Sequence, residues 1–283
     1  MMPVDRSFLL RADEGAGPRV GMLLVHGLGG TPVEMKSLAR SLRDAGTTVL
    51  ACQLAGHCGT ADDLRATRWE DWHASVEDGL ARLEAECDIV VVGGLSMGGL
   101  LAARLAWAHP ARVAGLVMLA PTLWYDGWSI PWYSFLLKLL IDTPVGQRFE
   151  FAERPPYGVK DERIRRLVLA AMQRGDSGNA GLLATPSQVI RQMWSLAALV
   201  KRILPAIRQP ALLVHARQDD IAGLSNTLHL QRHLGGRVDV LVLEDSYHLV
   251  TVDRQRGLVS RRVAGFLEGL RDEAARPQPA LVA

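Results

Sequence analysis

Short apolar runs alternate with longer amphipathic segments along most of this chain, and this alternation limits the fold more than any other feature. We predict buried strands at residues 20–25, 47–52, 89–92 and 113–119. We predict helices between and after them at residues 32–43, 69–86 and 97–108. The run at 89–92 is entirely Ile and Val, which is typical of a strand covered on both faces. The pattern predicts an α/β fold with a mostly parallel central sheet flanked by helices.

The alternation stops at Pro121 and resumes near residue 206. The later part carries predicted strands at 211–215 and 238–243 and predicted helices at 224–234 and 253–270. A structureless loop of the intervening length is improbable in a compact protein. We therefore predict a core domain formed by residues 1–121 and 206–283, with a helical insertion at 122–205. The end of the chain, residues 273–283, contains two prolines and is predicted to be loose.

The aromatic residues are concentrated in that insertion. Of 16 Trp, Tyr and Phe residues in the chain, ten lie between positions 122 and 200. Binding pockets for small molecules are lined mainly by apolar and aromatic side chains. We therefore expect the insertion to form a lid over a pocket, and its candidate wall residues are Trp124, Trp128, Trp132, Tyr133 and Trp194.

Composition excludes several classes of protein. Charged residues make up only 22% of the chain, which does not indicate a disordered protein. The net charge of +2 does not indicate a basic surface that would bind nucleic acid. The densest basic run, residues 163–166, is interpreted as a solvated helix face. Three cysteines cannot make a disulfide framework. The first 18 residues lack the apolar stretch of a signal peptide and no run is long enough to span a bilayer, so we expect a cytoplasmic protein.

One motif carries the chemistry. The segment Gly94-Leu95-Ser96-Met97-Gly98 matches the pattern G-x-S-x-G, between the predicted strand 89–92 and the predicted helix 97–108. In that context the serine lies on a sharp strand-to-helix turn, with its hydroxyl exposed above the carboxyl edge of the sheet. The alternative, a glycine-rich turn with an idle serine, is disfavoured by this context. We predict that Ser96 is a nucleophile.

A serine hydroxyl needs a base, and the base needs an acid that orients it. His248 is the histidine that follows the last predicted strand, so it is the candidate base. Asp219 and Asp220 both follow the strand at 211–215, and either could accept the ring N–H; Asp245 is a weaker candidate on the loop of His248 itself. The sequence alone does not choose between Asp219 and Asp220.

Two further groups of residues bear on the site. The glycine-rich turn at 26–30 ends the first clear strand, and its amides can point at the oxyanion of a tetrahedral intermediate. We assign the two oxyanion donors to the backbone amides of Leu28 and Met97. His229 and His233 have the i,i+4 spacing of a metal pair, but no third ligand is apparent and we interpret them as surface histidines. No metal, nucleotide or flavin is predicted.

With these pieces in this order, the chain resembles the serine α/β-hydrolases, and among them the bacterial carboxylesterases related to monoacylglycerol lipases. The resemblance covers residues 20–270 and is weakest in the insertion. It rests on the segments at residues 26–31, 54–57, 69–72, 93–99, 216–220 and 246–253. It implies an α/β-hydrolase fold with a helical cap inserted after the sixth strand. It also implies that Asp219, the first residue of the acidic pair, completes the triad with Ser96 and His248.

The resemblance implies a serine carboxylic ester hydrolase that works through an acyl-enzyme on a small-molecule ester. The same triad is compatible with thioesters, amides, carbamates, lactones or monoacylglycerols, with acyl transfer, or with a ligand-binding protein that has lost turnover. Where the family often has Gly-His-Gly, this chain has Cys58 after His57. That thiol could line or approach the pocket, and we favour the alternative that it is a small buried residue. The segment 131–141 could form an interfacial helix, although we favour packing of its apolar face on the core.

Overall fold

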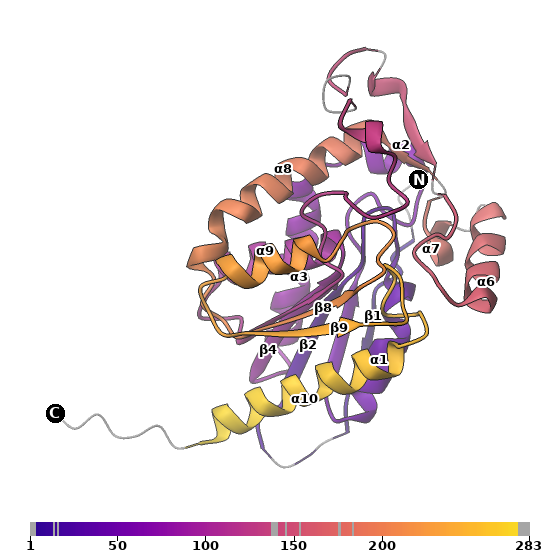
Figure 1. The fold of residues 1–283 in the computed structure, drawn as a ribbon. Coiled ribbons are helices and arrows are strands. Elements are labelled where there is room, and N and C mark those ends of the chain that lie inside the picture. Colours follow the sequence, from indigo (N-terminus) through magenta and orange to yellow (C-terminus); the bar gives the residue numbers. More distant parts are fainter. Residues whose placement is uncertain are drawn as a thin grey trace.

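A seven-stranded sheet forms the centre of the molecule in a computed structural model, which describes residues 4–13, 15, 17–136, 141–144, 146–152, 154–174, 177–182 and 184–276 (Figure 1). The strand order is β1-β3-β2-β4-β5-β8-β9. The strands are β1 (Phe8–Leu10), β2 (Val20–Val25), β3 (Thr48–Cys52), β4 (Ile89–Leu95), β5 (Gly115–Leu119), β8 (Ala211–Ala216) and β9 (Val238–Leu243). β1 pairs antiparallel with β3, and all other neighbours in this sheet are parallel. The predicted α/β fold with a mostly parallel sheet is confirmed.

Helices cover both faces of the sheet. One face packs against α1 (Lys36–Asp44) and α10 (Arg256–Ala275), and the other against α3 (Trp69–Glu84), α4 (Met97–Ala108) and α8 (Ser187–Ile203). The remaining short elements near the core are η1 (Pro32–Met35), α2 (Ala61–Arg65), η4 (Leu204–Ala206) and α9 (Ser225–His233). Figure 1 shows α9 on the same side of the sheet as α3 and α8.

The side chains of β4 alternate between two apolar cores, which explains the uninterrupted β-branched run. Val90 and Val92 pack with the α3, α4 and α8 side, whereas Ile89 and Val91 pack with the α1 and α10 side. A strand covered on both faces has no solvent-facing side, so alternate polar residues would be buried without partners. This burial places β4, and the serine that follows it, in the middle of the sheet.

The segment between β5 and β8 differs in detail from the prediction. It leaves the sheet after β5, the fifth strand in chain order and not the sixth, because a single strand, β1, precedes β2 in the part of the chain that the structure describes. It also includes a small antiparallel sheet and is therefore not purely helical. Its elements before α8 are η2 (Trp132–Leu136), η3 (Gly146–Arg148), β6 (Glu150–Ala152), α6 (Glu162–Gln173), α7 (Ser177–Ala180) and β7 (Ala184–Pro186).

Two parts of that segment bear on how much of it can cover the site. The apolar segment at 131–141, for which packing on the core is favoured over an interfacial helix, begins as the short 3-10 helix η2, and residues 137–140 lie outside the described residues. α8 falls inside the range predicted as cap, yet its apolar face packs onto α3 and α4 of the core. The amphipathic spacing of α8 predicts a helix but does not reveal which layer it covers.

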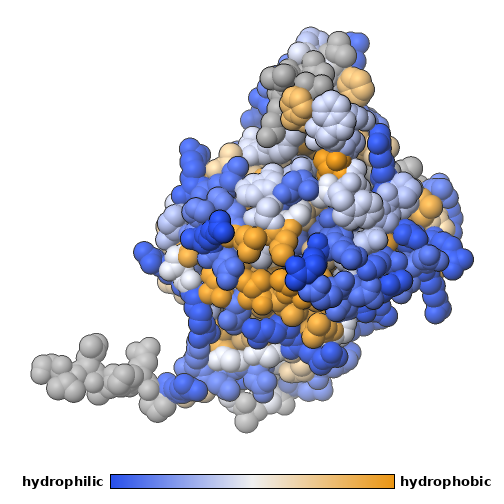
Figure 2. Space-filling model, in the orientation of Figure 1, coloured by the Kyte–Doolittle hydropathy of each residue, from blue (hydrophilic) through white to orange (hydrophobic). Residues whose placement is uncertain are grey.

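The last helix and the edge strand of the sheet differ in how far they are covered. α10 continues to Ala275, past the start of the predicted loose tail, because good helix formers precede Pro277; residues 277–283 lie outside the described residues. β9 forms one edge of the sheet with half-exposed Val238, Val240, Leu241 and Val242, and Figure 2 shows this apolar surface between α9 and α10. No helix in the described ranges combines the length and apolarity required to cross a bilayer.

Candidate active site

Ser96 occupies a strained turn between β4 and α4. Its φ of 55° and ψ of −117° are rarely adopted by an L-residue, and such strain persists only where the surroundings enforce it. Glycines on both sides allow the close approach that enforces it. A Cβ on Gly94 would lie 2.3 Å from the carbonyl carbon of Gly98, and a Cβ on Gly98 would lie 2.2 Å from the carbonyl oxygen of Val25. The elbow is therefore closed by backbone contacts that larger residues would prevent.

The structure brings Asp219 and His248 together from the loops after β8 and β9. His248 Nδ1 lies 2.8 Å from Asp219 Oδ2 and 3.0 Å from Oδ1, so the ring N–H donates to the carboxylate. The amides of Ile221 and Ala222 also donate to Asp219 Oδ1, each at 2.8 Å. Both side chains of the pair are buried. This geometry fixes the imidazole with Nδ1 protonated, which leaves Nε2 as the ring nitrogen for proton transfer.

The carboxylate of Asp219 stays ionised in this buried position. Burial by itself would raise the pKa of Asp219, but the charge of His248 and hydrogen bonds from His215 and His248 outweigh it. The pKa of Asp219 is therefore held well below its usual range. An ionised Asp219 can stabilise the imidazolium that forms when His248 takes a proton.

The other two candidate acids have different partners. Asp220 Oδ1 accepts the backbone N–H of His248 at 3.3 Å, and Oδ2 accepts the backbone N–H of Gly158 at 3.0 Å. Asp220 is fully buried, and it ties the histidine loop to the inserted segment. Asp245 is half-exposed and pairs with Lys160 and Arg254. The choice that the sequence left open between Asp219 and Asp220 thus falls geometrically on Asp219 as the partner of the ring.

The glycine-rich turn at 26–30 runs alongside Ser96. A Cβ on Gly27 would lie 3.6 Å from the Cβ of Ser96, which places this turn next to the nucleophile. His26 braces the turn: its Nδ1–H donates to the carbonyl of Gly27 at 2.9 Å and its Nε2 accepts the amide of Leu54 at 3.2 Å. The amide of Met97 is the first of helix α4, where an N–H has no acceptor within the helix. The Gly27 turn and the first residue of α4 thus both border Ser96, and the role of the Leu28 and Met97 amides as oxyanion donors stays a prediction.

The predicted pocket aromatics lie in different surroundings. Trp128 is 60% exposed, donates through Nε1 to the carbonyl of Gln218 and packs edge-on against Tyr247. It thus bridges the loops that carry Asp219 and His248. Trp132 is 83% exposed and Tyr133 48% exposed, with their rings in contact on η2. Their role as pocket walls stays a prediction.

The other two aromatics lie on the helical side. Trp124 is half-buried, donates through Nε1 to Asp126 and Ser225, and packs on His229 of α9. Trp194 is half-buried on α8. The His229 and His233 rings stack on each other, and the described residues contain no group of three or more ligating side chains that could hold a metal.

Cys58 is half-buried, and burial raises the pKa of its thiol to about 12.

Sequence reasoning missed Thr122, which the structure places against the hydroxyl of Ser96. Thr122 Oγ1 lies 3.0 Å from Ser96 Oγ, and the threonine is fully buried. The available signal was positional: Thr122 follows β5, the strand beside β4, and the carboxyl ends of parallel neighbours meet at the same edge.

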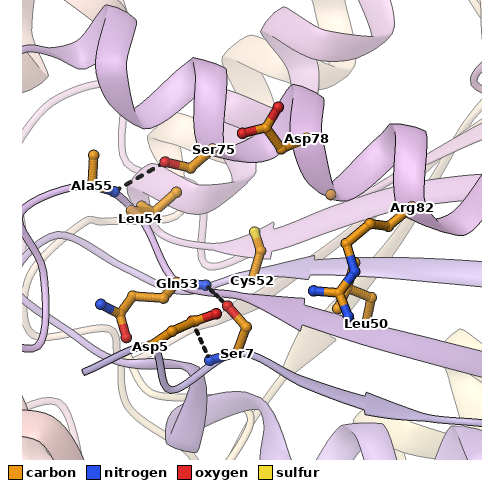
Figure 3. A pocket seen from close by; sticks show the side chains of 11 residues that line it. Asp5, Ser7, Leu50, Cys52, Gln53, Leu54, Ala55, Ser75, Asp78 and Arg82 are labelled. Atoms are coloured by element: carbon orange, nitrogen blue, oxygen red, sulfur yellow. Dashed lines mark hydrogen bonds between the residues drawn. The ribbon is translucent and has the colours of Figure 1, made fainter. Parts of the chain in front are cut away.

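A separate cavity of about 280 Å³ lies between α3 and the strands β1 and β3, and it contains none of the predicted site residues (Figure 3). Ser7 and Ser75 accept the backbone amides of Gln53 and Ala55 along its wall. The charged side chains at its rim, those of Asp5, Asp78 and Arg82, are exposed to solvent. It is therefore distinct from the cluster around Ser96.

Comparisons with known proteins agree with this geometry. Residues 16–255 match the family described as serine aminopeptidase, S33. The chain belongs to this family of serine hydrolases. It is 30% identical over 251 residues to the thermostable monoacylglycerol lipase of Bacillus sp. (strain H-257), covering 88% of this chain and 90% of that protein. It is 25% identical over 252 residues to a carboxylesterase of Bacillus subtilis (strain 168), covering 88% and 92%.

The fold comparison points the same way. The structure of this hydrolase superposes with a TM-score of 0.75 on a structure reported for LipS and LipT, two metagenome-derived lipolytic enzymes. The two sequences are 27% identical, and the match covers 93% of this chain and 97% of that one. A monoacylglycerol lipase of Paleococcus ferrophilus shares the fold at 18% identity, with a TM-score of 0.73 over 94% and 99% of the two chains. The predicted α/β-hydrolase fold is confirmed.

The pair formed by Asp219 and His248 can be tested without knowing the substrate. In Asp219→Asn the ring loses its ionised partner, so the rate of covalent labelling by a fluorophosphonate should fall by about 10³-fold or more. Asp245→Asn is the matched control, because it removes an exposed carboxylate on the histidine loop and should leave labelling nearly unchanged. Equal labelling rates for Asp219→Asn and the unmodified protein would contradict the assignment.

Two buried histidines beside the site should make the protein sensitive to acid. Burial lowers the pKa of His26 to about 3 and that of His57 to about 4, against about 6.5 in an unfolded chain. Between pH 6.5 and 4 the unfolded chain binds protons that the folded chain does not, so the free energy of unfolding should fall as the pH falls. The stabilisation is complete above pH 6.5.

Chemical denaturation at pH 7.5 and 5.0 measures this effect. His57→Gln should show a smaller loss of unfolding free energy between the two pH values than the unmodified protein, by up to about 1.4 kcal/mol per pH unit. His233→Gln, which replaces an exposed histidine, should keep the full pH dependence. The same pH dependence in His57→Gln and in the unmodified protein would rule out this role for His57.

Proposed function

We propose that this protein hydrolyses carboxylic esters through an acyl-enzyme formed on Ser96. One observation carries the proposal: the strained serine and the Asp219–His248 pair lie at the same edge of one sheet. The relatives named monoacylglycerol lipase and carboxylesterase support the ester bond as the target.

The reaction follows from the roles of these groups. Ser96 Oγ attacks the carbonyl carbon while Nε2 of His248 takes the serine proton, and Asp219 stabilises the resulting imidazolium. The amides of Leu28 and Met97 donate to the oxyanion. His248 then protonates the departing alcohol. In the second half it takes a proton from water, which attacks the acyl carbon, and it returns that proton to Ser96 Oγ as the bond to the acyl group breaks and the acid leaves.

We propose that residues 122–205 supply a cap over the site, and that its covering part lies before α8. Two sets of backbone contacts tie this segment to the catalytic loops. Leu182 N–H donates to the carbonyl of Gly29 at 2.9 Å, and Leu249 N–H donates to the carbonyl of Gly158 at 2.8 Å. The cap thus reaches both the oxyanion turn and the histidine loop, which is the arrangement expected of a wall that shapes the substrate site.

The substrate we favour is a medium-chain or aromatic ester of a small alcohol, monoacylglycerol included. The aromatic residues of the cap suit an apolar acyl or alcohol group. A thioester, amide, carbamate or lactone would require the same triad, so a substrate panel decides among them. Transfer of the acyl group to an added alcohol would indicate an acyltransferase.

Replacement of the nucleophile tests the proposal. In Ser96→Ala the hydrolysis of p-nitrophenyl esters should fall by about 10⁴-fold or more, because no other group can form the acyl-enzyme. Ser41→Ala, on the exposed face of α1, should keep the unmodified rate. Across a chain-length series, we expect medium-chain esters to be cleaved faster than acetyl or palmitoyl esters. Near-normal hydrolysis by Ser96→Ala would overturn the mechanism.

We further propose a weak contact of the cap with a lipid surface through η2. Trp132 and Phe135, at 83% and 55% exposure, present apolar rings to solvent there. The interface of a bilayer accommodates such rings, although a lasting attachment requires additional attraction.

Co-sedimentation with vesicles of neutral and anionic phospholipid measures this contact. Trp132→Ala should reduce the bound fraction severalfold. Trp107→Ala, which replaces a 39%-exposed tryptophan on α4, should leave it unchanged. No binding by the unmodified protein, or equal binding by both variants, would refute a role for η2.

A further inference from the structure

A threonine that the proposed triad does not include lies within hydrogen-bond distance of the Ser96 hydroxyl. Thr122 Oγ1 lies 3.0 Å from Ser96 Oγ. The threonine is fully buried, so this hydroxyl is withdrawn from bulk water. A buried hydroxyl in contact with the reacting oxygen affects where the serine proton points.

The turn after β5 is built to hold Thr122 in this place. Ala120 has a φ of 44°, a left-handed conformation that is costly for alanine, and its amide donates to the carbonyl of Val214 at 2.7 Å. On the other side, the amides of Leu123 and Trp124 donate to Asn226 Oδ1 at 2.8 and 3.0 Å. Thr122 is thus fixed from both directions along the chain.

Asn226 is itself anchored. Its Nδ2 donates to Asp126 Oδ1 at 2.9 Å and to the carbonyl of Gly223 at 3.0 Å, and the side chain is fully buried. An amide with its oxygen and nitrogen both engaged has little freedom to rotate. The backbone on both sides of Thr122 is therefore held by a network that extends from α9 to β5, outside the triad.

The single hydrogen of the Thr122 hydroxyl can be donated to either of two acceptors. Thr122 Oγ1 lies 3.3 Å from the carbonyl of Ala120 and 3.0 Å from Ser96 Oγ, and it has one hydrogen to donate. If that hydrogen goes to Ala120, the serine hydrogen is donated to Thr122 and points away from the base. If it goes to Ser96, the serine hydrogen is available for His248.

We propose that Thr122 is a further catalytic residue, which donates its hydroxyl hydrogen to Ser96 Oγ while the serine proton passes to His248; this proposal rests on the proposed function. The O–H bond of Ser96 breaks, its proton moves to Nε2 of His248, and an electron pair of Oγ forms the bond to the acyl carbon. The carbonyl electron pair moves onto the oxyanion. Thr122 keeps its own proton throughout.

The same hydrogen bond assists the second half of the reaction. When water attacks the acyl-enzyme, Ser96 Oγ is the leaving group and regains negative charge before His248 returns a proton to it. In the acyl-enzyme Oγ carries no hydrogen, so a bond between the two oxygens requires Thr122 as the donor. One fixed donor therefore stabilises charge on the same oxygen in both steps.

Paired substitutions separate the hydroxyl from the shape of the side chain. Thr122→Val keeps the branching and removes the hydroxyl, and it should lower kcat and the rate of fluorophosphonate labelling by about tenfold with KM changed by less than about twofold. Thr122→Ser keeps the hydroxyl and should stay within about threefold of the unmodified protein. Thr122→Ala provides a second variant without the hydroxyl, and thermal unfolding shows that each variant is folded.

The outcomes distinguish a wrong role for Thr122 from a wrong proposed function. Unmodified labelling rates in Thr122→Val and Thr122→Ala would overturn the role of Thr122, as would a Thr122→Ser variant as slow as Thr122→Val. Absence of ester hydrolysis by the unmodified protein would instead overturn the proposed function. The labelling rates of Ser96 would still test Thr122 in that case, with Ser96→Ala as the unlabelled control.

Discussion

The contact between the first turn of α4 and the end of β2 is the constraint on which the active site depends. At Gly98 the helix approaches the carbonyl of Val25 so closely that no side chain fits between them. This approach forces Ser96 into its strained conformation and aims the N-terminus of α4 at the space above the sheet. Because β4 lies in the centre of the sheet, the strain is supported by apolar cores on both faces.

The other polar residues of the candidate site lie on loops that follow the carboxyl ends of strands on one side of β4. Thr122 follows β5, Asp219 follows β8 and His248 follows β9. Buried polar contacts hold these loops in place, and Asp220 stands out because one carboxylate accepts the backbone amides of both His248 and Gly158. Asp220 thus ties the inserted segment at Gly158 to the loop that carries His248.

The features that the sequence predicts are those with a local physical signature. Strand β4 was predictable because burial on both faces demands an unbroken apolar run, and Ser96 because the elbow requires glycines at Gly94 and Gly98. Strand β1, with three residues at the sheet edge, leaves no such signature. The contact of Thr122 with Ser96 joins residues 26 positions apart through a strained turn, and no residue pattern records it. From the residue pattern, Asp219 and Asp220 were equally good partners for the imidazole. The structure shows that the carboxylate of Asp219 contacts the ring of His248, whereas Asp220 contacts its backbone.

The proposed mechanism requires that the reaction pass through an ester bond between the acyl group and Ser96. This can be measured by rapid mixing with a p-nitrophenyl ester, acid quenching within the first turnover and peptide mass analysis. We expect the peptide containing Ser96 to gain the mass of the acyl group during the burst of nitrophenol release. An acyl group found on a different residue, or hydrolysis with no acylated peptide at any time, would contradict it.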